Sequence, residues 1–401
     1  MGGSPYAPQF GMPDGLAHRS AHGFVVAPGG ISPGRAVPGI AGASAPAPAH
    51  RSRSAMNSGN GSAAGRNRAG GGAVSDHAPG RWLQDGVHRR RDVVSVGGSD
   101  HEIRRRCAGG SWRRLRRGAY AESAMLTGLD AVARHRLQVA ALLPEMAAGA
   151  VVSHQSAAVL LGAPIPPGLL DRVHVTRNRR YGGRIKAGLK VHCAPVDRVA
   201  ELGGRLITSP ARTVVDLART IPFAAAVVVG DALVREFGLT ADGLGRELEF
   251  ARRRRGAEVG RRVVAFLDPR SGGVAHSRAR VLLHHLGLPP AAAGGLVCGD
   301  GSVLGWVDLY LRGTGVVITL ADPTGPPHPV AGASRPAPPP DATLLRRYGF
   351  HHIRTTGREL RNGAAASRIR AALAESRQAP PHGDIRPAPL PPATPLPLRP
   401  L

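Results

Sequence analysis

The segment of residues 99–123 constrains the fold most, because its local signals fix where a helix begins and ends. Ser99 and Glu102 have the S-x-x-E spacing of a capping box, in which each side chain satisfies a backbone N–H of the first helical turn. The glycine pair at 109–110 supplies the left-handed geometry that ends a helix. We therefore expect a short helix that begins at about Asp100.

A β-hairpin is expected directly after this helix. Residues 112–116 and 119–120 read as two short strands around the tight turn Arg117-Gly118. Helix, tight turn and hairpin follow one another in this order in a winged helix-turn-helix.

The same segment is strongly basic and contains two aromatic residues. Arginine clusters interleaved with aromatic side chains are typical of surfaces that meet phosphate. The candidate DNA-binding residues are Arg104, Arg105, Arg106, Arg113, Arg114, Arg116, Arg117, Trp112 and Tyr120. The alternative is compositional drift, since only two of the 53 basic residues are lysine. We interpret the run Arg252–Arg255 in that second way, as a solvated helix end.

Length and charge set the broad class. A chain of 401 residues allows about two or three domains. The net charge of +26 favours acidic partners such as nucleic acid. The three cysteines are far apart and lack C-x-x-C spacing, which argues against both a disulfide framework and a zinc site. With neither a signal peptide nor an apolar run of about 18 residues, we expect a cytoplasmic protein without membrane contact.

The two ends of the chain differ in composition from its middle. Residues 1–80 are rich in Gly, Ala, Ser and Pro without periodicity, and we expect them to be disordered. Residues 377–401 are proline-rich, and we expect an extended, disordered tail. Between the ends, residues 81–123 form the basic segment.

Residues 124–270 mix helical and strand patterns, with helices in the majority. Helical periodicity or helix start signals appear at 132–146, 154–161, 210–220, 224–236 and 240–252, and alternating strands at 172–176 and 189–193. Ser153 and Ser209 are the expected N-caps of two of these helices. This predicts an α+β domain.

Residues 271–376 carry a more distinctive order of elements. We expect a helix at 277–286, strands at 296–298, 303–311 and 316–320, a helix at 341–348, a strand at 350–354 and a final helix after Gly357. Helix, three strands, helix and strand is the core order of the restriction-endonuclease-like α/β fold. The whole chain is thus expected to be an α+β multidomain protein.

Several motifs between residues 100 and 375 resemble a known family. They are HEIRRRCAGGSWRRLRRGAY at 101–120, VVSHQSAAVLLG at 151–162, DRVHVTR at 171–177, LITSPARTVVDLART at 206–220 and GWVDLYL at 305–311. They resemble actinobacterial proteins that join an AbiEi-type antitoxin module to a C-terminal very-short-patch-repair-like (DUF559) endonuclease domain. The resemblance implies a winged helix that binds operator DNA and represses its own toxin-antitoxin operon. It also implies a module that counters a nucleotidyltransferase-like toxin.

The sequence departs from this family in two places. Residues 82–98 contain glycines where the family has the first helix of its DNA-binding fold, so we expect a partial winged helix. The second departure concerns the carboxylates that hold Mg²⁺ in the nuclease. Asp308 matches the first, but Thr319 and Ala321 stand where the family has two more, and His276 replaces a glutamate.

Asp322 follows one residue too late to replace the missing ligands, since a slip of one turns a strand side chain to the other face. We therefore expect a degenerate site, with Asp308 as its one candidate metal ligand and no Mg²⁺ unless the site is active. The pairs His284-His285 and His351-His352 lack acidic or cysteine neighbours, and we do not expect metal there.

Three functions remain open at this point. The first is a non-enzymatic, antitoxin-like protein that binds double-stranded DNA. The second is a divergent Mg²⁺-dependent endonuclease that uses Asp308 with Asp322. The third is a scaffold that binds a nucleotidyltransferase-like toxin.

Overall fold

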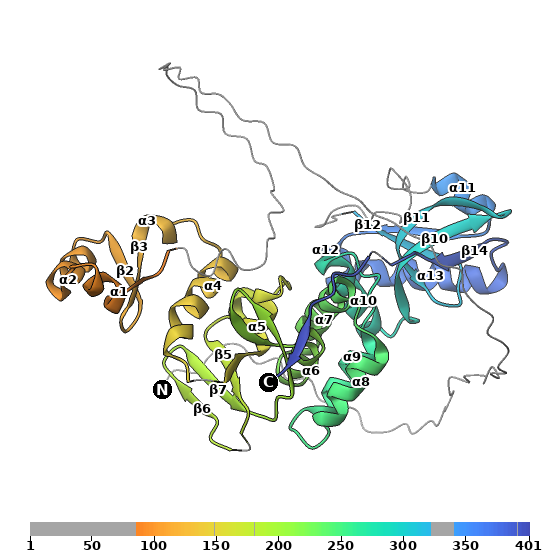
Figure 1. Ribbon diagram of the computed structural model, residues 1–401. Coiled ribbons are helices and arrows are strands. Elements are labelled where there is room, and N and C mark those ends of the chain that lie inside the picture. The colour runs from red at the N-terminus through yellow and green to blue at the C-terminus, as the bar shows by residue number, and fades with distance from the viewer. Residues whose placement is uncertain (1–85, 148, 180, 322–340, 391) are drawn as a thin grey trace, which may run out of the picture. The chain divides into compact units, whose positions relative to one another are not determined.

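The computed structural model describes residues 86–147, 149–179, 181–321, 341–390 and 392–401 (Figure 1). Helices and several sheets are mixed along the chain, as expected for an α+β protein. The disorder expected for residues 1–80 concerns a segment outside the described residues. Within the described ranges, no helix combines the length and the apolar character that a bilayer span requires.

The first described segment is a small helix-and-sheet unit. Its elements are β1 (His88–Arg89), α1 (Arg90–Ser95), α2 (Asp100–Ala108), β2 (Trp112–Arg116) and β3 (Ala119–Glu122), with strand order β1-β3-β2. The Ser99 hydroxyl accepts the N–H of Glu102 at 3.1 Å. Gly110 and Gly118 have φ values of +73° and +72°. Helix start, helix end and hairpin thus lie where the sequence predicts them, and α1 occupies part of the region where a helix seemed to be missing.

The middle of the chain builds a seven-stranded mixed sheet with strand order β15-β8-β9-β4-β5-β7-β6. Its strands are β4 (Ala150–Val152), β5 (Val173–Arg177), β6 (Arg184–Lys186), β7 (Leu189–Cys193), β8 (Arg198–Leu202), β9 (Arg205–Thr208) and β15 (Leu398–Pro400). The helices are α3 (Ser123–Leu126), α4 (Ala131–Leu142), α5 (His154–Leu160), α6 (Pro210–Thr220), α7 (Phe223–Phe237), α8 (Ala241–Phe250) and α9 (Ala257–Phe266), with short 3-10 turns at Leu143–Glu145 and Pro167–Leu169.

Helix α6 lies at the centre of this region. The Ser209 hydroxyl accepts the N–H of Arg212 at 3.1 Å, and Pro210 occupies the first helical position, as the sequence predicts. All but a few of its residues are buried, and Val214 and Leu217 join the large apolar core between sheet and helices. Burial of nearly every face of a helix means that its polar side chains need partners inside the protein.

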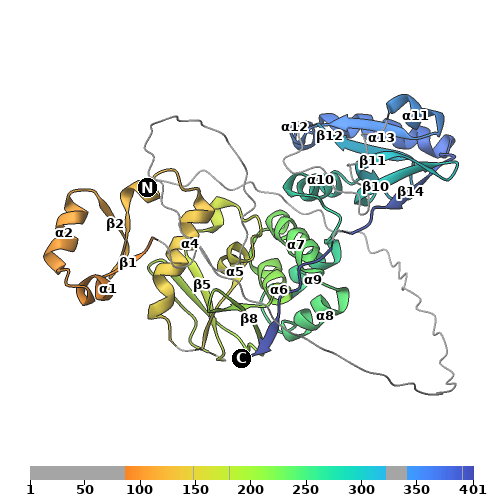
Figure 2. The same cartoon turned by 45° about the horizontal axis from the view of Figure 1, so that its top comes forward.

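The last region contains a five-stranded sheet with order β13-β12-β11-β10-β14 (Figure 2). Its strands are β10 (Ala291–Gly299), β11 (Ser302–Leu311), β12 (Val316–Leu320), β13 (His351–Thr355) and β14 (Asp384–Pro387), and its helices are α10 (Val274–His285), α11 (Ala342–Arg347), α12 (Gly357–Arg361) and α13 (Ala364–Gln378). Helices α10, α12 and α13 share one apolar cluster with the sheet, whereas Leu345 of α11 belongs to a second cluster. The β12–β13 pair is parallel, and the other strand pairs are antiparallel.

The structure corrects the expectation of a disordered tail at 377–401. Helix α13 continues to Gln378, β14 pairs with β10, and β15 pairs with β8. Both tail strands lie at sheet edges. Proline is tolerated there, because an edge strand needs hydrogen bonds on one side only. Proline content alone therefore does not exclude strand pairing.

Candidate nucleic-acid interface and a buried histidine cluster

Five arginines of the basic segment, carried by α2 and the β2–β3 hairpin, are together called the arginine surface: Arg104, Arg105, Arg113, Arg114 and Arg117. All five are exposed, and none forms an ion pair with another residue in the described part of the chain. Arg104 donates to the carbonyl of Asp100, and Arg114 to that of Arg116, so neither guanidinium bonds directly to a carboxylate. The helix and the adjoining hairpin thus present exposed cations that have no direct acidic partner among the described residues.

The carboxylates of this segment are engaged elsewhere. Residues 86–123 contain ten arginines against four acidic residues. Asp92 and Asp100 pair with arginines at positions 89–91, Glu102 with Arg106, and Glu122 lies 3.6 Å from His88. The acids thus neutralise other groups and leave the arginine surface positive.

Two of the predicted DNA-binding arginines, Arg106 and Arg116, hold internal contacts instead. Arg106 lies 2.6 Å from Glu102 and stacks over the Trp112 ring at 4.8 Å. Arg116 lies 2.7 Å from Glu145, and its Nε and one terminal nitrogen are buried. These arginines tie the hairpin to its surroundings, and their charges are less available to a ligand.

The aromatic residues of the segment pack inside it. Trp112 is only 6% exposed, and its ring stacks with His88 at 4.4 Å and with Tyr120 at 6.1 Å. A buried indole cannot stack on a nucleic-acid base. The assignment of Trp112 as a DNA contact is therefore wrong for this conformation, and Trp112 and Tyr120 serve as the small core of the hairpin.

The structure brings Asp308 of β11 together with His276 of α10. Their Oδ1 and Nε2 atoms lie 3.3 Å apart, and Asp308 Oδ2 accepts the N–H of Leu320 at 2.7 Å. The N–H of Gly272 donates to His276 Nδ1, which places the imidazole proton on Nε2, facing the carboxylate. Oδ2 of Asp308 thus accepts a backbone hydrogen bond, and Oδ1 faces the imidazole of His276.

The other described positions that the sequence predicts for a nuclease-like site, Thr319, Ala321 and His276, carry no second carboxylate. Thr319 donates to or accepts from His352 at 2.9 Å, and Ala321 is apolar. Asp322 lies outside the described residues. A single carboxylate is a poor match for Mg²⁺, which prefers several oxygen ligands.

A second cluster, which the sequence reasoning missed, joins three histidines of the middle region. His154 is the first residue of α5, His174 lies on β5, and His192 lies on β7. Each offers one ring nitrogen, and these nitrogens all lie within 4.8 Å of one another. In the parallel β5–β7 pair, Thr176 is opposite His192, so His174 and His192 point to the same face. The signal available in the sequence was one histidine in each of the two strands, β5 and β7, that the alternation of residues predicts.

The histidines of this cluster are connected by close contacts. His174 Nδ1 lies 3.1 Å from His192 Nε2, and the His154 and His192 rings stack at 3.7 Å. His154 Nδ1 lies 3.0 Å from the Ser153 hydroxyl, which also accepts a hydrogen bond from Thr176. The expected capping role of the Ser153 side chain is therefore wrong, because its hydroxyl faces these groups and caps no backbone N–H.

Burial keeps the cluster neutral near pH 7. It lowers the pKa of His154 to about 4, of His174 to about 2 and of His192 to about 3. Neighbouring cations, including Lys190, act in the same direction.

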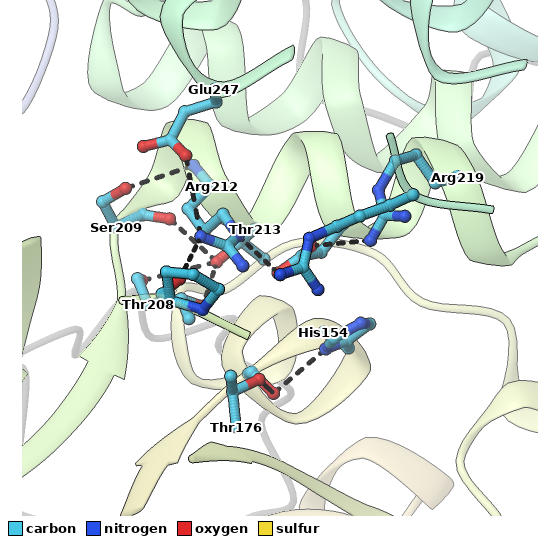
Figure 3. Close-up of polar contacts among 12 residues, drawn as sticks. His154, Thr176, Thr208, Ser209, Arg212, Thr213, Arg219 and Glu247 are labelled. Carbon is cyan, nitrogen blue, oxygen red and sulfur yellow. Dashed lines mark hydrogen bonds and ion pairs between the residues drawn. The ribbon is translucent and has the colours of Figure 1, made fainter. Parts of the chain in front are cut away.

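A buried ion-pair network on α6 lies beside His154 (Figure 3). Asp216 accepts from Arg212 at 2.9 Å and from Arg219 at 3.1 Å. Burial alone would raise the pKa of Asp216, but nearby His154 and the two guanidinium groups outweigh it and lower this pKa. Glu247 of α8 lies 4.0 Å from Arg212, and burial raises its pKa to about 6.

A pocket of about 690 Å³ opens next to the histidines and this network. It is lined by His154, Lys190, His192, Arg219, Thr220, Arg254, Arg255, Gly256 and Val259. No carboxylate is among these lining residues. Arg254 is half-buried and donates to the carbonyl of Cys193, so the interpretation of Arg252–Arg255 as a fully solvated run is wrong for this residue.

Comparison with known proteins finds relatives for one part of the chain. No protein-family model matches the sequence. A stretch of 106 residues, 26% of this chain, is 32% identical to the uncharacterized proteins MT2308 and Rv2248 of Mycobacterium tuberculosis, strains CDC 1551 / Oshkosh and ATCC 25618 / H37Rv. The match spans 39% of the length of each of these relatives.

Proposed function

We propose that the chain is an antitoxin-like protein that binds double-stranded DNA through the arginine surface. The observation that carries this proposal is which charged side chains of residues 86–123 form ion pairs and which do not. The carboxylates pair with other groups, while five exposed arginines on α2 and the β2–β3 hairpin keep their charge. Guanidinium groups match phosphate oxygens in geometry as well as in charge.

The order of elements suits this role. In a partial winged helix, α2 would enter the major groove with Arg104 and Arg105, and the hairpin would contact the backbone with Arg113 and Arg117. Contacts of this kind position the protein on DNA and supply a large part of its affinity. Repression of a toxin-antitoxin operon and a toxin partner follow from the family resemblance alone.

The nuclease-like domain supports a non-enzymatic role. We propose that this domain has a restriction-endonuclease-like fold and descends from an active endonuclease. The Asp308 carboxylate contacts His276 and the Leu320 N–H, an arrangement that holds the carboxylate within the protein. We therefore expect no Mg²⁺-dependent cleavage of DNA.

Single substitutions in the full chain test the interface. Arg105→Ala, Arg113→Ala and Arg117→Ala should each weaken binding to a fluorescent duplex in an anisotropy titration, because each removes one cation that faces phosphate. Arg253→Ala is the matched control, since Arg253 is equally exposed but lies outside the segment. Equal affinities for all four variants and the wild type would exclude the arginine surface as the interface.

A further inference from the structure

The histidine cluster offers three neutral nitrogen ligands from three separate elements. His154 comes from the start of α5, His174 from β5 and His192 from β7, and their ligand atoms lie within 4.8 Å of one another. Three convergent imidazoles are a frequent ligand set for zinc in sites that keep a fourth position open.

The distances fit a tetrahedral ion. Zinc–nitrogen bonds of about 2.0–2.1 Å place two ligand nitrogens roughly 3.3 Å apart. His174 Nδ1 and His192 Nε2 lie 3.1 Å apart. Two imidazole nitrogens at this separation share either one proton or one metal ion. One ring nitrogen of His154, whose ring stacks on His192, lies within 4.8 Å of a ring nitrogen of each of the other two histidines.

The surroundings of His154 provide the outer contacts that such ligands use. Its Nδ1 faces the Ser153 hydroxyl, and Thr176 donates to that same hydroxyl. An imidazole that donates from Nδ1 is fixed in the tautomer whose Nε2 can bind metal. Figure 3 shows His154 and Thr176 on the two sides of this contact.

We propose that His154, His174 and His192 bind one Zn²⁺ ion whose fourth position faces the pocket and takes a phosphate group. His154 and His192 both line this pocket, which places the open side of the ion there. Three neutral ligands leave the charge of the ion uncompensated. Lys190, Arg219 and Arg254 line the same pocket, and these cations favour an anionic fourth ligand such as phosphate.

Metal titration of the full chain tests the proposal. The protein is prepared without a histidine tag, freed of metal with a chelator and titrated with Co²⁺, a spectroscopic substitute for Zn²⁺. We expect one tightly bound ion per chain, the visible absorption of tetrahedral cobalt and displacement by Zn²⁺. Inorganic phosphate should then change that absorption, because it enters the coordination sphere. A wild-type chain that binds no Co²⁺ overturns the site, and an absorption indifferent to phosphate overturns the assignment of the fourth ligand.

Two variants and a control locate the ion. His154→Gln and His192→Gln should each weaken Co²⁺ binding by at least tenfold, because each removes a ligand. His285→Gln should bind as the wild type does, since His285 is exposed on α10, outside the cluster. Circular dichroism shows whether each variant is folded. A folded His192→Gln variant with wild-type affinity contradicts the proposal.

Discussion

At the scale of single residues, buried charges organise the middle of the molecule. Asp216 is almost completely buried and is contacted by Arg212 and Arg219, whose side chains are also buried. Removing one partner of a buried ion pair is costly, because the other charge then stays inside the protein without compensation.

Asp216→Asn should therefore lower the free energy of unfolding by roughly 3–5 kcal/mol, since it leaves two guanidinium groups without their carboxylate. Chemical denaturation measures the change. Asp242→Asn, on the exposed side of α8, is the control, and we expect a much smaller effect there. A loss no larger than that of the control would show that the network contributes little to stability.

Glu247 makes stability depend on pH. Its pKa in the folded protein is about 6, above the ordinary value of 4.5, so between these values the folded state binds more protons than the unfolded state. The contribution of Glu247 to stability is thus complete below pH 4.5 and is lost as the pH rises through 6. Glu247→Gln removes this loss of stability, because glutamine has no carboxyl group to ionise.

The advantage of Glu247→Gln over the wild type should accordingly increase between pH 4.5 and pH 7, by on the order of 2 kcal/mol. Denaturation of both proteins at several pH values measures it. A constant difference across this range would contradict the raised pKa.

The sequence predicts some of these residues and not others. The basic character of residues 101–117 is visible in the sequence, but the pairing of Arg116 with Glu145 depends on the fold. The histidine cluster was missed for the same reason, because pairing of β5 with β7 brings its members together. The sequence does identify Asp308 and His276 as relevant positions, whereas their direct contact appears only in three dimensions.

At the scale of elements, local signals account for the correct predictions. Caps, glycine turns and alternation locate α2, the β2–β3 hairpin, α6 and β11 to within a few residues. The missed strands β1, β4, β6, β8 and β9 are short, and the missed strands β14 and β15 contain proline. Strands β4, β14 and β15 are stabilised by partners distant in sequence, as Val152 of β4 is by Ile207 of β9, and a local pattern carries little information on them. Strands β8 and β9 pair with each other across a short turn, so this hairpin was a local feature that the prediction missed.

Helix α2 should depend on its cap. Ser99→Ala removes the acceptor of the Glu102 N–H and should cost about 1 kcal/mol of stability. It should also weaken DNA binding, because Arg104 and Arg105 would lose their fixed positions. Ser99→Asp retains an acceptor at the cap and should restore the stability. A Ser99→Ala variant as stable as the wild type would argue against this cap.

At the scale of the whole molecule, the net charge of +26 attracts nucleic acid in general. In residues 86–123 the carboxylates pair with other groups, and this pairing is the basis for proposing the arginine surface as the DNA-binding site. The total charge alone cannot distinguish an interface from nonspecific attraction. Replacing the five arginines of the arginine surface distinguishes the two. Arg252, Arg253 and Arg255 stay exposed elsewhere on the protein in such a variant, so a loss of DNA binding would come from the arginine surface.

The salt dependence of DNA binding tests the central claim most directly. If the arginine surface neutralises about five phosphates, log affinity should fall with log salt concentration at a slope of about −4.5. Replacing Arg105, Arg113 and Arg117 together by alanine should make that slope shallower by about 2.7, because each phosphate contact contributes about 0.9. A slope that is unchanged in this triple variant, or binding that is insensitive to salt in the wild type, would contradict the account.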